Sequence, residues 1–164
     1  MNKLNIVLYE PEIPQNTGNI SRTCAATGTS LHLIKPLGFS IDDKHLKRAG
    51  LDYWHLLDLH VYENIDEFYS KNEGQFIYTS TKAGKIHSEM EYNGNVYLFF
   101  GPETRGLPED IIQKNIENSV RLPMIPDARS LNLSNTVAVC VYEVLRQWNY
   151  EGLSDKGKFS LNND

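Results

Sequence analysis

Short apolar runs with strand character alternate along this chain with segments of helical character, and this alternation constrains the fold more than any other feature. The runs with strand character are residues 4–9, 31–34, 58–62, 75–80, 96–100 and 119–122. Helices are expected at residues 17–27, 64–74, 108–115 and 133–149, with a further short one after Asp42. Strands that alternate with helices form parallel sheets covered by helices. The sequence therefore predicts an α/β domain around a mostly parallel sheet.

Capping residues and glycines mark the ends of these helices. Gly28 ends the first, Asn64 with Glu67 three residues on resembles a capping box, and Asp42 begins a short basic helix that Gly50 stops. The last helix carries a stripe of apolar residues at helical spacing, which predicts one buried face. That stripe comprises Leu133, Val137, Val141, Leu145 and Trp148.

The 164 residues suit one domain, expected at residues 1–151, followed by a mobile tail at 152–164. The chain has no apolar run near the roughly 20 residues that cross a bilayer, and its N-terminus lacks the pattern of a signal peptide. We therefore expect no membrane span and a cytoplasmic location. Cys24 and Cys140 stand among Ala, Val or Thr without ligand spacing to histidine, which predicts two buried free thiols.

The formal net charge of −5 argues against nonspecific binding to polyanions, so any nucleic-acid partner must meet a local cluster of cations. The candidates for such a surface are Lys44, Lys47, Arg48, Lys82, Lys85, Arg105, Arg121 and Arg129. Val139, Tyr142 and Val144 lie on the last helix beyond its main apolar stripe. A lone small domain would leave some of them exposed, which predicts a homodimer.

Three loops that follow strands are unusually rich in small and polar residues. They are N-T-G-N-I-S-R from Asn16, F-G-P-E-T-R-G-L-P from Phe100 and P-D-A-R-S-L-N-L-S-N from Pro126. Each contains features that helix capping or a glycine turn would explain, yet the third has more polar residues than capping needs. Ligands of open α/β sheets bind beyond the carboxyl ends of strands, so we expect the site there.

The same loops exclude several kinds of site. Leu107 and Pro108 stand where a phosphate-binding P-loop needs Lys and Ser or Thr, and no G-x-G-x-x-G occurs in the chain. None of the three loops contains a histidine, and no compact group of metal ligands is present, so we expect neither a conventional base nor a metal ion. At Gly101 a side chain would intrude where backbone approaches a ligand.

Together the three loops resemble the signature motifs of the SPOUT superfamily of methyltransferases, in its 2′-O-ribose branch. The resemblance spans about residues 4–150 and includes N-I-V-L-Y-E-P-E-I-P from Asn5 and R-A-G-L-D-Y from Arg48. With this extent and no added RNA-binding domain, the chain is similar to the tRNA wobble-nucleotide 2′-O-methyltransferases, the TrmL or YibK-like group. A SPOUT protein that methylates a base or another RNA, and a non-catalytic RNA-binding or assembly factor that keeps the cofactor pocket, stay open as alternatives.

The resemblance implies a single SPOUT domain with a deep C-terminal trefoil knot built from about residues 75–135. It implies S-adenosylmethionine as the cofactor, a homodimer, and the anticodon stem-loop of tRNA as the partner. Carried over by position, cofactor contacts fall on four residues, Thr79, Gly101, Leu122 and Ser130.

The resemblance also places Arg22 at the ribose hydroxyl. The high pKa of arginine favours stabilisation of developing alkoxide over proton abstraction. Asn16 and Glu103 would then orient Arg22 and its loop, while Ser130 and Asn132 hold cofactor and ribose.

Overall fold

The computed structural model describes residues 1–44, 46, 48 and 51–159, and its centre is a seven-stranded sheet. The strands lie in the order β3-β2-β1-β6-β4-β7-β5, and every pair is parallel. They are β1 (Lys3–Tyr9), β2 (Ser30–Ile34), β3 (Leu59–Tyr62), β4 (Gln75–Thr79), β5 (Lys85–Ile86), β6 (Asn95–Phe100) and β7 (Ser119–Arg121). The predicted α/β class with a parallel sheet is confirmed.

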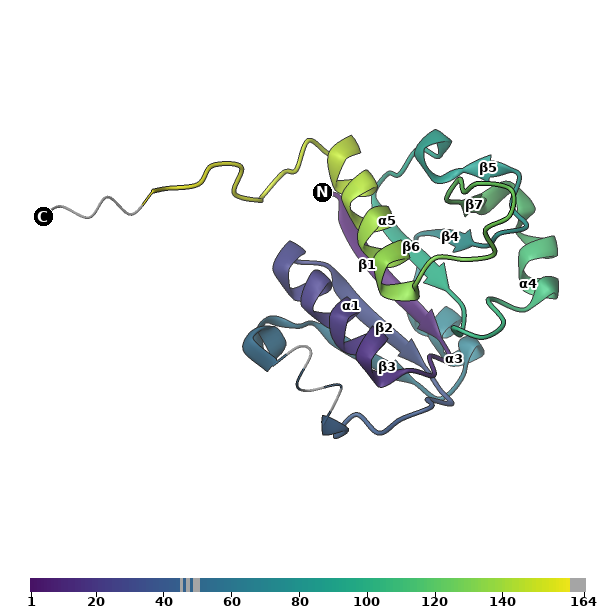
Figure 1. Cartoon of the computed structure of the whole chain (residues 1–164), viewed down its shortest axis with the longest axis horizontal. Helices are drawn as coiled ribbons and strands as arrows, with labels where there is room; N and C mark the ends of the chain where they lie inside the picture. The colour runs from purple at the N-terminus through teal and green to yellow at the C-terminus, as the bar shows by residue number, and fades with distance from the viewer. Residues whose placement is uncertain (45, 47, 49–50, 160–164) are drawn as a thin grey trace, which may run out of the picture.

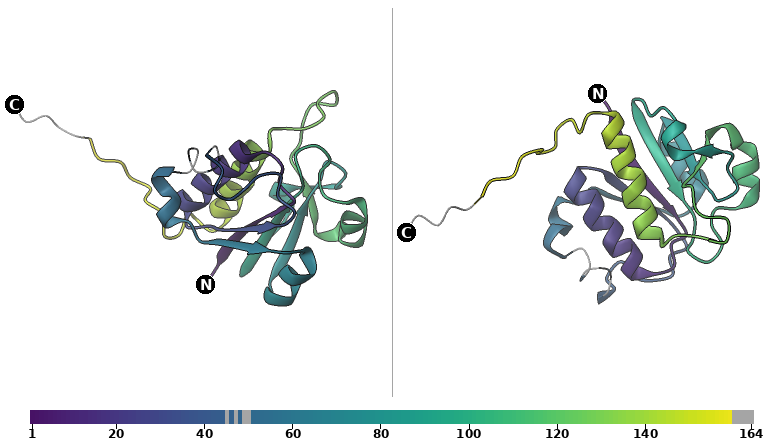
Figure 2. Two further views of the ribbon diagram at one scale, coloured as in Figure 1. Left: turned by 90° about the horizontal axis from the view of Figure 1, so that it is seen from below. Right: turned by 45° about the horizontal axis from the view of Figure 1, so that its top comes forward.

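Helices cover both faces of this sheet (Figures 1 and 2). One face carries α1 (Pro14–Thr27) and α5 (Leu133–Gln147), and the other carries α3 (Ile65–Lys71) and α4 (Glu109–Lys114). Short 3₁₀ turns complete the framework at Leu51–Leu56, His87–Glu89 and Ile116–Asn118. After Gly152 the described chain leaves the domain as an extended trace (Figure 1), and its mobility stays a prediction.

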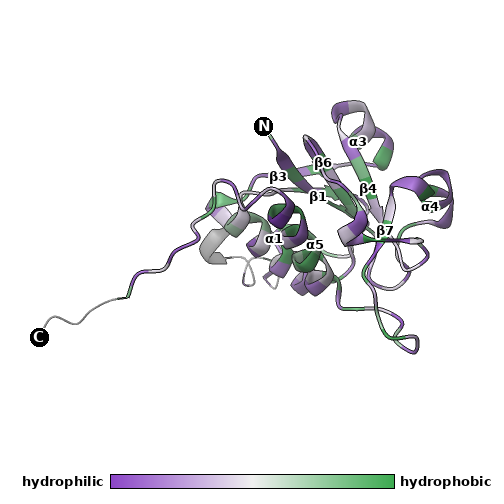
Figure 3. Cartoon of the chain, turned by 90° about the horizontal axis from the view of Figure 1, so that it is seen from above, coloured by the Kyte–Doolittle hydropathy of each residue, from purple (hydrophilic) through white to green (hydrophobic). Residues whose placement is uncertain are grey.

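Two apolar cores follow from this layering, because side chains alternate between the faces of each strand. Ile6 and Leu8 of β1 point into the core beneath α1 and α5, whereas Val7 points into the core beneath α3 and α4. Phe68 of α3 is fully buried in the second core, with its ring edge-on to several aromatic neighbours. Figure 3 shows the hydrophobic residues gathered between the layers.

Several element boundaries differ from the sequence-based expectations. Helix α1 begins at Pro14 rather than Thr17, because proline fits the first helical turn, where its missing N–H is not needed. The two-residue strand β5 was not predicted, since it is too short to show a period. The expected basic helix after Asp42 includes residues outside the described part of the chain.

Helix α5 matches the predicted amphipathic pattern with one correction. Its buried face contains Val137, Val141 and Leu145 as expected, but it also includes Val144, which is fully buried. Val144 is therefore a core residue and does not belong to the exposed apolar surface expected on this helix. Val139 and Tyr142 remain about half exposed. Cys24 and Cys140 are buried free thiols, as predicted, and burial raises the pKa of each.

A buried polar network crosses the strands on the α3 face, centred on His32. Asn5 Nδ2 donates to Asn95 Oδ1 at 2.8 Å, so Asn5 Oδ1 faces His32 Nε2 at 3.2 Å. His32 Nε2 therefore carries the proton, and Nδ1 accepts from the Tyr62 hydroxyl at 2.9 Å. The Tyr62 oxygen in turn accepts from Asn72 Nδ2. The network is complete with a neutral imidazole, and burial lowers the pKa of His32 to about 3.

This network predicts acid sensitivity of the fold. In the unfolded chain His32 titrates near its ordinary pKa of about 6.5, so below that pH the unfolded state binds the extra proton. The free energy of unfolding should then fall by about 1.4 kcal/mol per pH unit between pH 6 and 4.5 on account of His32 alone. Urea unfolding at fixed protein concentration measures this slope. His32→Asn is the control, and an equal slope in both proteins would rule out His32 as the cause.

Candidate active site

A cleft of about 870 Å³ lies at the carboxyl ends of β4, β6 and β7, where three loops of the parallel sheet meet. Its size is that of a typical small-molecule site. The lining combines residues 79–82 after β4, residues 100–109 after β6, and residues 120–122, 124 and 129–133 between β7 and α5. Ile13 and Asn16 at the start of α1 complete one wall, and Ile112 and Thr136 contribute from α4 and α5.

A chain of hydrogen bonds joins the three motif loops across one side of this cleft. Asn16 Nδ2 donates to Glu103 Oε1 at 3.4 Å, and Asn132 Nδ2 donates to Asn16 Oδ1 at 3.1 Å. Asn132 Oδ1 then accepts from the backbone N–H groups of Ser134 and Asn135, which caps α5. These hydrogen bonds thus hold together residues that are more than a hundred positions apart in the sequence. The sequence predicted a helix cap among Ser130, Asn132 and Ser134, and the structure assigns it to Asn132.

Glu103 also fixes the entry into α1. Its two carboxylate oxygens accept from the backbone N–H groups of Glu12 at 2.8 Å and Ile13 at 3.1 Å. A carboxylate at the N-terminus of a helix satisfies free N–H groups and favours the helix dipole. Glu103 therefore acts here as a cap supplied by another loop, in place of a side chain from Ile13, which has none to offer.

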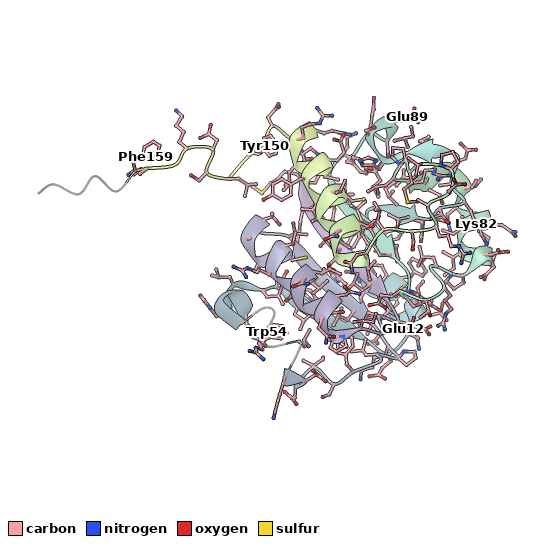
Figure 4. The ribbon with its side chains drawn as sticks, in the orientation of Figure 1. Glu12, Trp54, Lys82, Glu89, Tyr150 and Phe159 are labelled. Carbon is pink, nitrogen blue, oxygen red and sulfur yellow. The ribbon has the colours of Figure 1, made fainter. Side chains whose placement is uncertain are left out.

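Two further contacts fasten the same pair of loops, and sequence reasoning did not find them. The backbone N–H and the hydroxyl of Thr104 both donate to Glu12 Oε1, which lowers the pKa of the Glu12 carboxyl. Arg105 forms an ion pair with Glu10 at 2.7 Å. The only sign of these contacts in the sequence is the pair of acidic residues that follows the first strand, Glu10 and Glu12. Figure 4 labels Glu12, which lies near the start of α1.

Gly101 permits the tight turn of the loop after β6. A Cβ atom at this position would lie 2.0 Å from the backbone N of Leu107 and 2.1 Å from the carbonyl carbon of Gly106. The loop therefore closes back on itself at Gly101. The chain itself gives a reason for glycine here, in addition to the expected approach of a ligand.

Seven of the eight site residues expected from the sequence line the cleft. They are Asn16, Thr79, Gly101, Glu103, Leu122, Ser130 and Asn132. Arg22 is not among the lining residues, since it is exposed on α1, six residues beyond Asn16. Six residues turn a helix through about 600°, so Asn16 and Arg22 lie on different sides of α1. The geometry of one copy thus brings together the expected cofactor residues but not the expected catalytic arginine.

The chemistry of the cleft is mixed. Leu107, Leu122 and Leu133 supply apolar walls, whereas the Ser130 hydroxyl is exposed and has no hydrogen-bond partner in the described chain. The Thr79 hydroxyl donates to the carbonyl of Phe99 at 2.7 Å and keeps its lone pairs available. No histidine is present among the described lining residues. The described residues also contain no group of three or more His, Cys, Asp or Glu able to hold a metal ion.

The chain belongs to the SpoU rRNA Methylase family, whose model matches residues 3–142. Over 153 residues it is 58% identical to a protein of Listeria monocytogenes named putative tRNA (cytidine(34)-2′-O)-methyltransferase, covering 91% of this chain and 90% of that relative. A solved structure that concerns the 2-OH methylation of C/U34 on tRNA is 41% identical, with a TM-score of 0.85. The two cover 92% of this chain and 99% of that one.

A more distant solved structure carries the cofactor of this family. The SpoU methyltransferase AviRb of Streptomyces viridochromogenes, in complex with AdoMet, superposes with a TM-score of 0.80 at 21% identity. The match covers 91% of this chain and 62% of that protein. At this identity the likeness establishes a common fold. Within the described residues, no helix is both long and apolar enough to cross a membrane.

The closed loop predicts a sharp contrast between two of its glycines. Gly101→Val should lower the free energy of unfolding by about 3 kcal/mol or more, because the new side chain meets backbone atoms that cannot move aside. Gly106 has φ +70° with open space around its Cβ position, so Gly106→Ala should cost about 1 to 2 kcal/mol, the cost of a left-handed residue. Urea unfolding of both variants measures the contrast. A cost at Gly101 no greater than at Gly106 would contradict the closed-loop explanation.

Proposed function

We propose that this protein is an S-adenosylmethionine-dependent methyltransferase that acts on the ribose 2′-hydroxyl of the wobble nucleotide in the tRNA anticodon loop. The observation that carries the proposal is the single cleft at which all three motif loops meet and are joined through Asn16, Glu103 and Asn132. Relatives covering nine-tenths of the chain bear the name of this activity. Because its substrate is tRNA, we expect the protein to act in the cytoplasm.

The residues of the cleft fit S-adenosylmethionine. Leu122 and its apolar neighbours offer a surface for adenine, while Thr79, Ser130 and the backbone around Gly101 offer polar groups for the rest of the molecule. When bound there, the cofactor would supply an electrophilic methyl group. Glu103 is already engaged by two backbone N–H groups and Asn16, so its part is to hold the walls of the cleft.

The chain itself must position the ribose and favour the charge that develops on its oxygen. No lining residue of the described chain is a histidine, so a conventional imidazole base is missing from this cleft. Arg22 is our candidate for stabilising the developing alkoxide, with Asn132 and Ser130 holding the ribose and cofactor. Arginine side chains do not act as proton acceptors in proteins, so the hydroxyl proton leaves to water or to a phosphate.

A second copy of the chain would offer a cleft for Arg22. It lies outside the cleft of its own copy, on the layer formed by α1 and α5. Val139 and Tyr142 on α5, and Tyr150 in the turn that follows it, are each between 42% and 50% exposed. Exposed apolar groups on paired helices favour association with a second copy. We therefore propose a homodimer in which each copy supplies Arg22 to the cleft of its partner.

The expected knot fits the order of the strands. Strand β7 lies between β4 and β5, so the five residues 80–84 that connect those two strands must cross the path of β7. Ser80 N donates to the carbonyl of Val120 at 3.0 Å, and Arg121 Nη1 donates to the carbonyl of Thr81 at 3.0 Å. In a trefoil knot one segment of the chain passes through a loop formed by another. The crossing of residues 80–84 over β7 supports the proposed knot.

The activity predicts a methyl group on one ribose of tRNA. Incubation with labelled S-adenosylmethionine and bulk tRNA, followed by nucleoside digestion and mass spectrometry, should find 2′-O-methylcytidine or 2′-O-methyluridine from position 34. Arg22→Ala should lower the single-turnover rate by about 100-fold or more, as loss of a transition-state donor does, with little change in cofactor affinity. A methyl group on a nucleobase would overturn the ribose assignment. A near-parental rate for Arg22→Ala would overturn the role of Arg22.

The homodimer predicts a mass twice 18.7 kDa in light scattering at micromolar concentration. It also predicts complementation between two inactive variants, Arg22→Ala and Ser130→Trp, in which the tryptophan obstructs the exposed cleft. In a mixed dimer the intact cleft of the Arg22→Ala copy receives Arg22 from its partner, so co-expression should restore activity. A monomeric mass would refute the dimer, and dimers without complementation would refute the sharing of Arg22.

A further inference from the structure

Four cations line the cleft, and the structure gives them different surroundings. Lys82 is paired with Glu109, and Arg105 is paired with Glu10. An ion pair leaves little net charge to attract a further anion. Figure 4 labels Lys82 at the edge of the domain. Two of the four cations are therefore neutralised by carboxylates of the chain itself.

The remaining two are Arg121 and Arg129. The Arg121 guanidinium donates to the carbonyl of Thr81 and so is oriented toward the connection that crosses β7. Arg129 has no ion pair and no hydrogen-bond partner among the described residues, although Asp127 lies two positions away on the same loop. Of the described cations that line the cleft, Arg129 alone is left without a partner in the chain.

The position of Arg129 suits a large ligand better than a small one. Every residue from 125 to 132 is exposed, and the loop between β7 and α5 projects from the domain (Figures 2 and 3). Ile125 and Leu131 on the same loop are 74% and 48% exposed. A projecting loop that offers one free guanidinium with apolar side chains beside it matches an RNA strand, which presents phosphates and base faces together.

We infer that Arg129 contacts a backbone phosphate of the RNA substrate beside the cleft, and that Lys82 and Arg105 do not make such contacts while they are paired. The inference rests on the proposed function, since it takes the ligand outside the cleft to be tRNA. Each phosphate contact releases counterions from the RNA, so its loss lowers the salt dependence of binding. Arg129 should therefore be recognisable in the salt slope and not only in affinity.

The test measures binding of a labelled tRNA transcript to the full chain over a range of salt concentrations. Arg129→Gln should reduce the slope of log K against log salt by about 1 and weaken binding roughly fivefold at 0.15 M salt. Arg129→Lys keeps the charge and should keep most of the slope. Lys71→Gln removes one positive charge, paired with Glu67, from α3 on the other side of the sheet, and should change the slope little.

A second control examines the pairing argument. The double variant Lys82→Gln with Glu109→Gln removes a whole ion pair at the cleft without altering net charge, so the salt slope should stay parental. Conversely, Glu10→Gln frees Arg105 from its carboxylate, and the slope should increase by up to about 1. A loss of slope in the double variant equal to that of Arg129→Gln would overturn the distinction between paired and free cations.

Calorimetry with S-adenosylmethionine separates the two anions available to an arginine beside this cleft, an RNA phosphate and the carboxylate of the cofactor. Parental cofactor affinity in Arg129→Gln supports the phosphate, whereas weaker cofactor binding with an unchanged salt slope overturns it. An equal loss of slope in Lys71→Gln would also overturn it, since net charge would then explain the effect. If the parent binds tRNA through Arg129 but leaves position 34 unmethylated, the proposed function fails and the phosphate contact stands.

Discussion

The carboxylate of Glu103 is the interaction on which the arrangement of this site depends. It replaces the side-chain cap that Ile13 cannot give and so fixes where α1 begins, at 2.8 and 3.1 Å from two backbone N–H groups. Through Asn16 it also reaches Asn132, which begins α5. Each of these hydrogen bonds contributes on the order of 1 kcal/mol, so the helices and the loop after β6 are interdependent. The walls of the cleft cannot move separately without breaking one of these bonds.

The parallel sheet explains why these residues meet at all. β1 pairs with β6 from Lys3 opposite Asn95 to Leu8 opposite Phe100, so the loops that follow the two strands start side by side. The pairing is enforced by burial on both faces, because a slip of one residue would exchange the two cores. Residues of one motif therefore approach residues of another more than eighty positions away.

The sequence predicted the frame of this protein better than its contacts. Periodicity and breakers indicated six of the seven strands and the stripe on α5, because these depend on local pattern. A cap before the apolar run of α5 was also predictable, but the choice of Asn132 over Ser130 and Ser134 was not. The bonds of Glu12 to Thr104 were not, since an exposed carboxylate on one loop gives no sign of the loop it will face. Val144 was wrongly predicted to lie outside the buried face, because the predicted apolar stripe was too narrow for a helix that packs against both β1 and α1.

The loop before α5 interleaves side chains that hold the structure with side chains left for a ligand. Asn132 donates from its side-chain Nδ2 to Asn16, and its side-chain Oδ1 accepts from the first turn of α5. Ser130 and Arg129, in contrast, have no partners in the described chain. The density of polar residues in the sequence could not separate these roles, because all three side chains are polar. The hydrogen bonds of each group separate the roles. A polar group that is already bonded within the chain stabilises the fold, and one left exposed in a cleft is available to bind a ligand. The same criterion distinguishes Arg129 from Arg105. Both arginines line the cleft, but Arg105 is already paired with Glu10.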